Sequence, residues 1–283
     1  MFQALFNDSF IQMALFGGLL ASLASGTMGS FVVVKRIVFI AGGISHSILA
    51  GTSFCLWLQK VHHIAWIGPI HGAFAAAIIS ALLLGWIHLN YRQREDAIIA
   101  AIWSTGMAIG VIFLSLTPGN NAEMMNFLFG NILWITKQDL LFLGILNGII
   151  LLTISLNYRK FLSLCFDEEQ AYLRGINVKR LYMLLLCVIA LTIVLLVQII
   201  GTILVIALLT IPATLSSLFT RSLPAMIVLA TILSIFFSVG GLISSYFLNW
   251  PAGATIALLS AAGYLLALLG KKKGPLKTLL KFS

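Results

Sequence analysis

The chain has 283 residues, of which 60% are hydrophobic and only 9% are charged. A soluble domain carries about 25% charged residues, so this composition excludes an ordinary soluble protein and indicates a helical protein of the membrane. The net charge of +9 does not indicate a nucleic-acid partner, because the basic residues stand in short clusters between apolar runs, as in the cytoplasmic loops of membrane proteins.

Apolar runs of about 20 residues, the length of a membrane span, recur along the whole sequence. We expect an all-α, polytopic integral membrane protein with about nine transmembrane helices, eight being possible. The count is open at 180–220, where an uncharged apolar run is either two spans or one span and a re-entrant piece. The expected spans are 10–33, 37–58, 67–90, 97–116, 138–157, 180–199, 201–220, 224–247 and 252–270.

The distribution of charge favours nine spans. With nine, fifteen of the seventeen Lys and Arg residues lie on one side of the membrane, and only Lys60 and Lys137 lie on the other. The positive-inside rule makes the basic side the cytoplasm, with the N-terminus outside and the C-terminus inside.

Small residues recur at every fourth position of the first two spans. Such ridges allow helix backbones to approach closely, so we expect tight packing around both spans. The ridges are Gly17, Ala21, Ser25 and Gly29 in the first span, and Gly43, Ser47 and Gly51 in the second.

His46 stands in the middle of the second span, within FIAGGISHSILAG, ten residues after Arg36. Ten residues of helix rise about 15 Å, which places His46 near the midplane of a hydrocarbon core about 30 Å thick. Ionisable residues at that depth are costly and usually face a bundle interior or a polar path. Neutral imidazole is a ligand for zinc and other transition metals, so His46 is a candidate metal ligand, the alternative being a histidine hydrogen-bonded to a neighbouring helix.

Other residues are weaker candidates for a metal path. His71 lies near the outer end of the third span and His88 near its inner end, so with His46 imidazoles occur at three depths. The segment 117–136 is too mixed for a clean span and is expected to be a re-entrant or interfacial piece on the outer side. Its Glu123 either receives the ion or caps a turn.

The only sizeable polar segment, LCFDEEQAYLRGINVKR, lies on the cytoplasmic side at about 160–178. Asp167, Glu168 and Glu169 precede a short apolar stretch, and Gly175 follows it. Acidic residues at the start and glycine at the end predict a short helix. This helix is either a solvated connector or the contact for a soluble partner.

Several stretches together resemble the permease of bacterial metal-ion ABC importers, the zinc/manganese/iron group often called the ABC-3 family. They are SFVVVKRIVFIAGGISHSILAG, DAIIAAIWSTGMAIGVIFLSLTPGNNAEMMNFLFGNIL, FDEEQAYLRGINVKRLYMLLL and VQIIGTILVIALLTIPATLSSLFTRSL, and the resemblance covers nearly the whole chain. It implies a single transmembrane permease domain over 1–283, in the bacterial inner membrane and surrounded by its lipid.

The resemblance also implies partners and a mode of action. The permease would form a homodimer with a metal path near the dimer axis, and an extracytoplasmic metal-binding protein would deliver the ion. Cytoplasmic ABC ATPase subunits would dock on the short helix, through Glu168, Glu169, Ala171 and Gly175. The sequence has no GxxxxGK[ST] motif, so we expect no ATP site, no enzymatic activity of the chain alone and no permanently bound cofactor.

One position departs from the pattern of the family. Many members have an aspartate one turn before the histidine of the second span, and this chain has Gly42 there. Manganese favours oxygen ligands, so the loss of the carboxylate favours zinc as the transported ion. Two symmetry-related His46 residues would supply a pair of nitrogens across the dimer axis.

Two other classes of protein are alternatives. A secondary, ion-coupled transporter of a small cation would need an acid or base inside a span, but no Asp or Glu falls well inside one, and Glu95 and Asp96 stand at the cytoplasmic start of the fourth. An intramembrane enzyme would have to use His46 with Ser45 or Ser47, and adjacent residues of a helix point about 100° apart, which is poor geometry for a dyad.

Overall fold

Helices make up nearly all of the described chain in the computed structural model, which describes residues 9–64, 66–91, 95–119, 127, 130 and 135–271. The all-α class expected from the sequence is therefore confirmed. The helices are α2 Ser9–Val34, α3 Val38–Val61, α4 Pro69–Asn90, α5 Glu95–Ser115, α7 Lys137–Phe166, α8 Glu168–Leu173, α9 Val178–Ile200, α10 Thr202–Ser217, α11 Leu223–Leu248 and α12 Ala252–Lys271.

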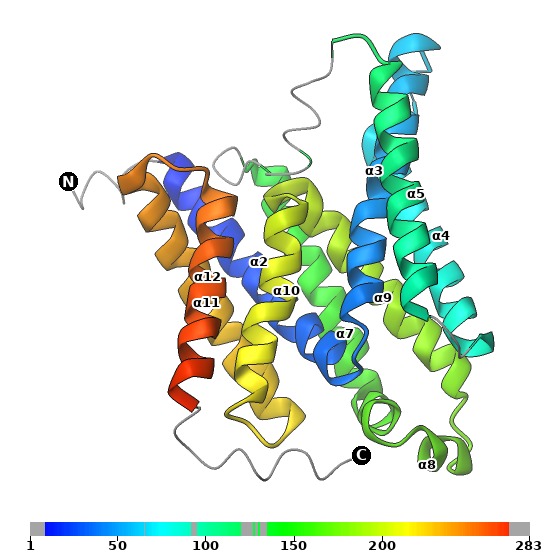
Figure 1. Ribbon diagram of the computed structural model, residues 1–283, viewed down its shortest axis with the longest axis vertical. Helices are drawn as coiled ribbons and strands as arrows, with labels where there is room; N and C mark the ends of the chain where they lie inside the picture. Colours follow the sequence, from blue (N-terminus) through cyan, green and yellow to red (C-terminus); the bar gives the residue numbers. More distant parts are fainter. Residues whose placement is uncertain are drawn as a thin grey trace.

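Eight helices of the described chain are long and apolar enough to cross a membrane, which is the lower of the two expected counts. The expected span 201–220 forms α10, which has only 16 residues and accounts for the difference. Gly201 separates α10 from α9 with a φ of 80°, a conformation that residues with a Cβ rarely adopt. This glycine makes the turn in the uncharged run 180–220, and α10 leads back to the end of the molecule where α9 begins (Figure 1).

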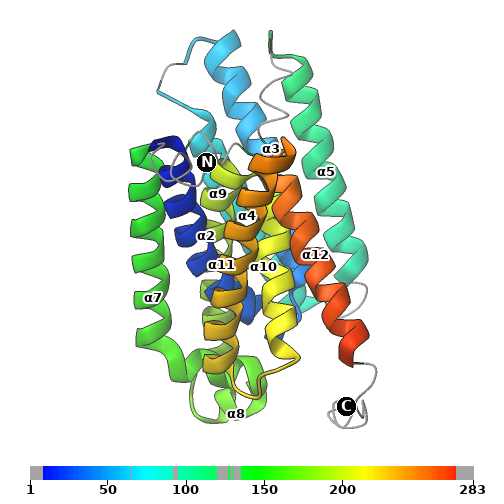
Figure 2. The same ribbon diagram turned by 90° about the vertical axis from the view of Figure 1, so that its left-hand side faces the viewer.

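The expected span 138–157 is part of a longer helix. α7 has 30 residues and leaves helical geometry only at Asn157, whose φ is −114° and ψ is 15°. The kink coincides with the expected end of the span, and the remaining turns continue to α8. α7 runs along one edge of the molecule (Figure 2).

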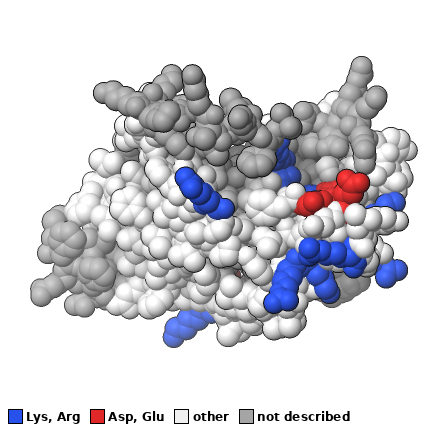
Figure 3. Space-filling view, turned by 90° about the horizontal axis from the view of Figure 1, so that it is seen from below, with Lys and Arg blue, Asp and Glu red and all other residues white. Residues whose placement is uncertain are grey.

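The basic residues gather at the end of the molecule that carries α8 (Figure 3). This end is formed by the α2–α3 turn, the end of α7, α8, the start of α9 and the α10–α11 turn (Figure 1). Its exposed basic side chains are Arg36, Arg159, Lys160, Arg174, Lys179, Arg180 and Arg221. The positive-inside rule places this end in the cytoplasm, so we call it the inner end and the opposite end the outer end.

α9 lies between two groups of helices and contacts both (Figure 1). α3, α4 and α5 pack together on one side of it, and α2, α10, α11 and α12 pack together on the other. Fully buried aliphatic residues of α9, such as Ile189, Ile193 and Val194, belong to one core that includes residues of both groups.

The small residues of α2 and α3 lie where helices approach most closely, as expected. A Cβ added to Gly29 of α2 would overlap the carbonyl oxygen of Leu209 in α10. In α3, the backbone of Gly51 meets that of Gly72 in α4, and a Cβ added to Gly106 of α5 would lie 2.7 Å from the Cα atom of Ser47. α3 is therefore held by backbone contact on two sides, which fixes the position of every side chain that it carries.

We predict that Gly51→Ala destabilises the protein by about 1–3 kcal/mol, because its methyl group overpacks the α3–α4 contact. Gly148→Ala in α7 is the matched control, since its new Cβ meets open space. The measurement is the midpoint of thermal unfolding of the detergent-solubilised protein. If Gly51→Ala unfolds at the same midpoint temperature as the native protein, α3 and α4 can move apart to admit the methyl group without loss of stability.

Candidate functional site

His46 is half-buried between α3 and α5. Its imidazole stacks on the indole of Trp103, with ring centroids 4.3 Å apart and planes inclined by 14°. The Nδ1 atom of His46 is buried and has no hydrogen-bond partner among the described residues. The alternative expectation was a hydrogen bond from His46 to a neighbouring helix. At Nδ1, the described chain contains no such hydrogen bond. His46 is a ring held in place by stacking.

Gly42 and His46 lie one turn apart, and both face Trp103. A Cβ added to Gly42 would lie 3.3 Å from the Cζ3 atom of the indole. The position where many relatives of the resembled family carry a carboxylate is therefore covered by an aromatic ring. Trp103 was not among the residues selected from the sequence, because a tryptophan in an apolar span is ordinarily a packing residue.

The other candidate histidines do not converge on His46. The Nδ1 atom of His71 accepts a hydrogen bond from the backbone N–H of Gly68, 3.1 Å away, in the first turn of α4. The ring of His88 stacks on Tyr182 of α9, with centroids 4.9 Å apart. Seventeen residues of helix separate His71 from His88, which corresponds to about 26 Å. Their placement in a metal path stays a prediction, and Glu123 lies outside the described residues.

No group of three or more His, Cys, Asp or Glu side chains that could hold a metal ion occurs in the described chain. In the described part of one copy, His46 therefore does not belong to a site with three ligands of these types. A weakly held ion suits transport better than storage, because an ion in transit has to leave each site that it enters.

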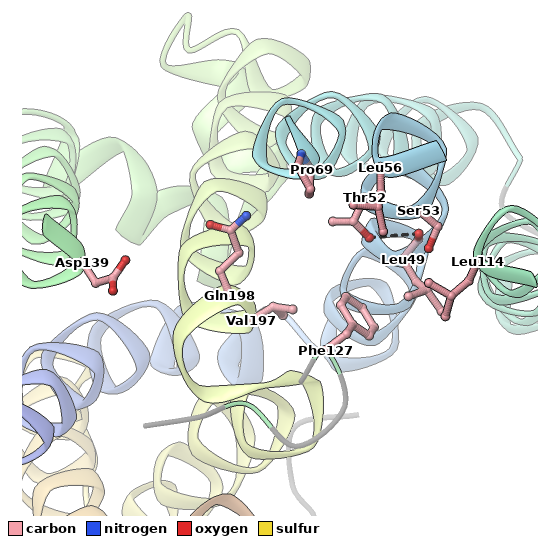
Figure 4. Close-up of a pocket in the computed structure, with 10 residues that line it drawn as sticks. All are labelled: Leu49, Thr52, Ser53, Leu56, Pro69, Leu114, Phe127, Asp139, Val197 and Gln198. Atoms are coloured by element: carbon pink, nitrogen blue, oxygen red, sulfur yellow. Dashed lines mark hydrogen bonds between the residues drawn. The ribbon is translucent and has the colours of Figure 1, made fainter. Parts of the chain in front are cut away.

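A cavity of about 370 Å³ lies at the outer end, directly beyond His46 along α3 (Figure 4). Leu49 and Ser53, three and seven residues after His46, line it. Its polar lining comes from Thr52 and Ser53 of α3, Gln198 of α9 and Asp139 of α7. Figure 4 shows Gln198 between the α3 side chains and Asp139, which lies on the far side of the cavity.

Asp139 also has a structural task. One of its carboxylate oxygens, Oδ2, accepts hydrogen bonds from the backbone N–H and the hydroxyl of Thr136, at 2.9 and 2.7 Å. This capping arrangement fixes the start of α7 and holds the carboxylate at the rim of the cavity. The cavity was not predicted from the sequence, because its lining comes from segments far apart in the chain.

The short helix expected at the inner end is α8, and its four predicted residues have different environments. Asp167 caps the helix by accepting a hydrogen bond from the N–H of Gln170 at 2.8 Å. Glu168 forms an ion pair with Lys35, Glu169 is exposed and Ala171 is fully buried. Gly175 ends the segment with a φ of 76°. Ala171 thus packs α8 against its own chain, and the part of all four residues in docking stays a prediction.

Two apolar side chains of α8 face away from the chain. Tyr172 is 73% exposed and Leu173 is 78% exposed, next to the acidic Glu169. We expect this basic end to lie in the cytoplasm, where lipid would not cover these side chains. Sequence reasoning selected the charged and glycine positions and missed this pair.

A bundle of membrane-spanning helices, with an intramembrane histidine, an outer polar cavity and an inner helix that presents apolar side chains, defines a multi-pass transport protein. Comparisons with known proteins specify its class. The ABC 3 transport family matches residues 7–271. The chain belongs to this family of metal-transport permeases, as its sequence motifs indicated.

Similar proteins come from several bacteria. A probable metal transport system membrane protein of Chlamydia trachomatis is 46% identical over 89% of this chain and 86% of its own length. The high-affinity zinc uptake system membrane protein ZnuB of Haemophilus influenzae is 30% identical, covering 92% and 97%. The manganese transport system membrane protein MntC of Halalkalibacterium halodurans is also 30% identical, covering 94% and 89%.

A solved structure shares the fold. The chain matches PsaBC from Streptococcus pneumoniae in complex with Fab, with a TM-score of 0.82, 28% identity and coverage of 94% of both chains. The chain is therefore a multi-pass protein of the inner membrane, as expected.

We predict that Trp103→Ala increases the reactivity of His46 toward diethyl pyrocarbonate several-fold, because the indole covers one face of the imidazole. The experiment uses a background in which the other four histidines, His62, His63, His71 and His88, are replaced by Gln. Trp86→Ala is the control, since Trp86 packs on Tyr91 of the same chain, away from His46. An unchanged rate would show that stacking does not restrict access to His46.

Proposed function

We propose that this chain is the membrane-spanning permease of an ATP-driven importer that passes a divalent transition-metal ion, preferentially zinc, to the cytoplasm. The observation that carries the proposal is the half-buried imidazole of His46 in an apolar helix, one turn inward of a polar outer cavity. An ion that enters the cavity meets hydroxyl, amide and carboxylate oxygens first, and His46 is the first imidazole of α3 on its way inward.

The preference for zinc rests on the ligand types. Relatives named for zinc and for manganese are both 30% identical to this chain, so overall similarity does not decide between the metals. At the site itself, Gly42 and Trp103 stand where a carboxylate would provide oxygen ligands. An imidazole without a carboxylate favours zinc over manganese.

The proposed complex includes a second copy of the chain, two ATPase subunits and an extracytoplasmic metal-binding protein, with 1–283 acting as one permease domain. The surface of α5 supports the homodimer. In its inner half it exposes the small or hydroxyl side chains of Ala101, Ser104, Thr105 and Ala108, and only further outward the bulky Ile109, Val111 and Ile112. The exposed side of α7 carries bulky residues such as Leu152 and Leu156. Small and hydroxyl side chains allow close contact between helices, and bulky aliphatic ones suit lipid. A dimer through α5 would bring both His46–Trp103 pairs toward its axis.

The decisive experiment measures ATP-dependent uptake in proteoliposomes that hold this chain with its ATPase and its metal-binding protein. Zinc, manganese and iron are compared for the native chain, for His46→Ala and for the control His62→Ala in the outer loop. We expect zinc to be taken up best and His46→Ala to abolish its uptake, because the variant removes the imidazole that we place on the metal path. Manganese uptake that survives in His46→Ala would place the path elsewhere.

We predict that the double variant Tyr172→Ser, Leu173→Ser weakens co-purification of the ATPase at least several-fold, because it removes the exposed apolar pair of α8. Tyr91→Ser is the matched control, since it removes an exposed tyrosine from the inner end of α4. Retention of the ATPase at the native stoichiometry by the double variant would show that α8 is not its docking site.

A further inference from the structure

Lys35 lies in the sharp turn between α2 and α3. The turn ends α2 with two backbone hydrogen bonds, from Ile37 N–H to the Val32 carbonyl at 3.0 Å and from Arg36 N–H to the Val33 carbonyl at 3.1 Å. Arg36 adopts a φ of 59°, the left-handed conformation typical of this helix stop. Only Lys35, Arg36 and Ile37 separate the two helices, so α3 follows any movement of the turn.

The ammonium group of Lys35 contacts three other elements. Its Nζ atom donates a hydrogen bond to the carbonyl of Leu164, 2.9 Å away, in the last turn of α7. It forms the ion pair with Glu168, the first residue of α8. It also lies 5.8 Å from the ring centroid of Tyr182 in α9.

This arrangement is more than a surface ion pair. The side chain of Lys35 is only 10% exposed, and the Leu164 carbonyl is at a helix C-terminus, where the partial negative charge attracts a cation. Tyr182 is almost fully buried and stacks in turn on His88 at the inner end of α4. A cation taken out of water holds its partners firmly, because separating them leaves an unpaired buried charge.

The exposed surface of α8 and the start of α3 are therefore connected through one side chain. Glu168 is in the same short helix as Tyr172 and Leu173, at which we place the ATPase. On the other side of Lys35, α3 begins at Val38, and His46 lies eight residues further on, about 12 Å along a rigid helix.

We propose that Lys35 is a positioning residue that transmits movement of α8 to α3 and so couples the ATPase to the metal path. A displacement of α8 carries Glu168 with it, and the buried ammonium group draws the α2–α3 turn in the same direction. This inference rests on the proposed function, in which α8 receives the ATPase.

The test compares Lys35→Met with native protein in the reconstituted complex, with the number of ions transported per ATP hydrolysed as the main readout. We expect the complex to assemble and hydrolyse ATP while this ratio falls about tenfold, the order of a typical coupling between sites. Lys35→Arg should restore the ratio largely, because guanidinium keeps the charge and the N–H donors. Arg36→Met is the matched control, since it removes an exposed positive charge from the same turn.

Glu168→Gln removes the charge of the α8 partner in the same ion pair. It replaces Lys35→Met as the test variant if Lys35→Met does not fold. Glu168 is half-exposed, so its neutral analogue leaves the packing intact and should lower the ratio in the same direction. A native ratio in Lys35→Met, or in Glu168→Gln when Lys35→Met does not fold, would overturn the role of Lys35. If instead the native complex does not assemble through α8, as judged by the Tyr172 and Leu173 variant, the proposed function fails first.

Discussion

The close approach of helix backbones around α3 is the constraint on which the rest of the structure depends. In a protein that is apolar both inside and outside, helices gain little from burying side chains and associate through packing at small residues. Gly51 meets Gly72 on one side of α3, and Ser47 meets Gly106 on another. This double contact sets the rotation and the depth of α3. The imidazole of His46 stacks on Trp103 because both helices are held at that distance.

Polar chemistry is distributed by depth around this frame. The outer end has a cavity with oxygen donors, the middle has one imidazole, and the inner end has a buried ammonium group with its partners. Each group lies in surroundings that offset the free energy of removing it from water. The cavity is open, His46 would bind a metal as neutral imidazole, and Lys35 has a carboxylate, a carbonyl and an aromatic ring around it. Such a series of polar groups suits a permease for cations. α3 lines the outer cavity and carries His46, so it takes part in two of the three groups.

Much of this fold could be predicted from the sequence, because spans follow from apolar length and orientation from the placement of Lys and Arg. The expected division of the uncharged run at residue 200 agrees with the turn at Gly201, but α10 has only 16 residues, so eight helices of the described chain are long enough to cross a membrane. His46 and α8 were found as isolated features in the sequence. Their partners Trp103 and Lys35 were not, because a stacked ring and an ion pair join residues that lie 57 and 133 positions apart.

The lengths of two helices show where the bilayer itself acts on the protein. α10 has 16 residues, about 24 Å, which is less than the thickness of a hydrocarbon core of about 30 Å, whereas the 30 residues of α7 extend about 45 Å. α10 is enclosed by α2, α11 and α12, so lipid does not have to thin to match it. α7 exposes Leu152 and Leu156 and bends at Asn157. A thicker or thinner membrane would therefore act on α7, which exposes these side chains to lipid and continues directly into α8.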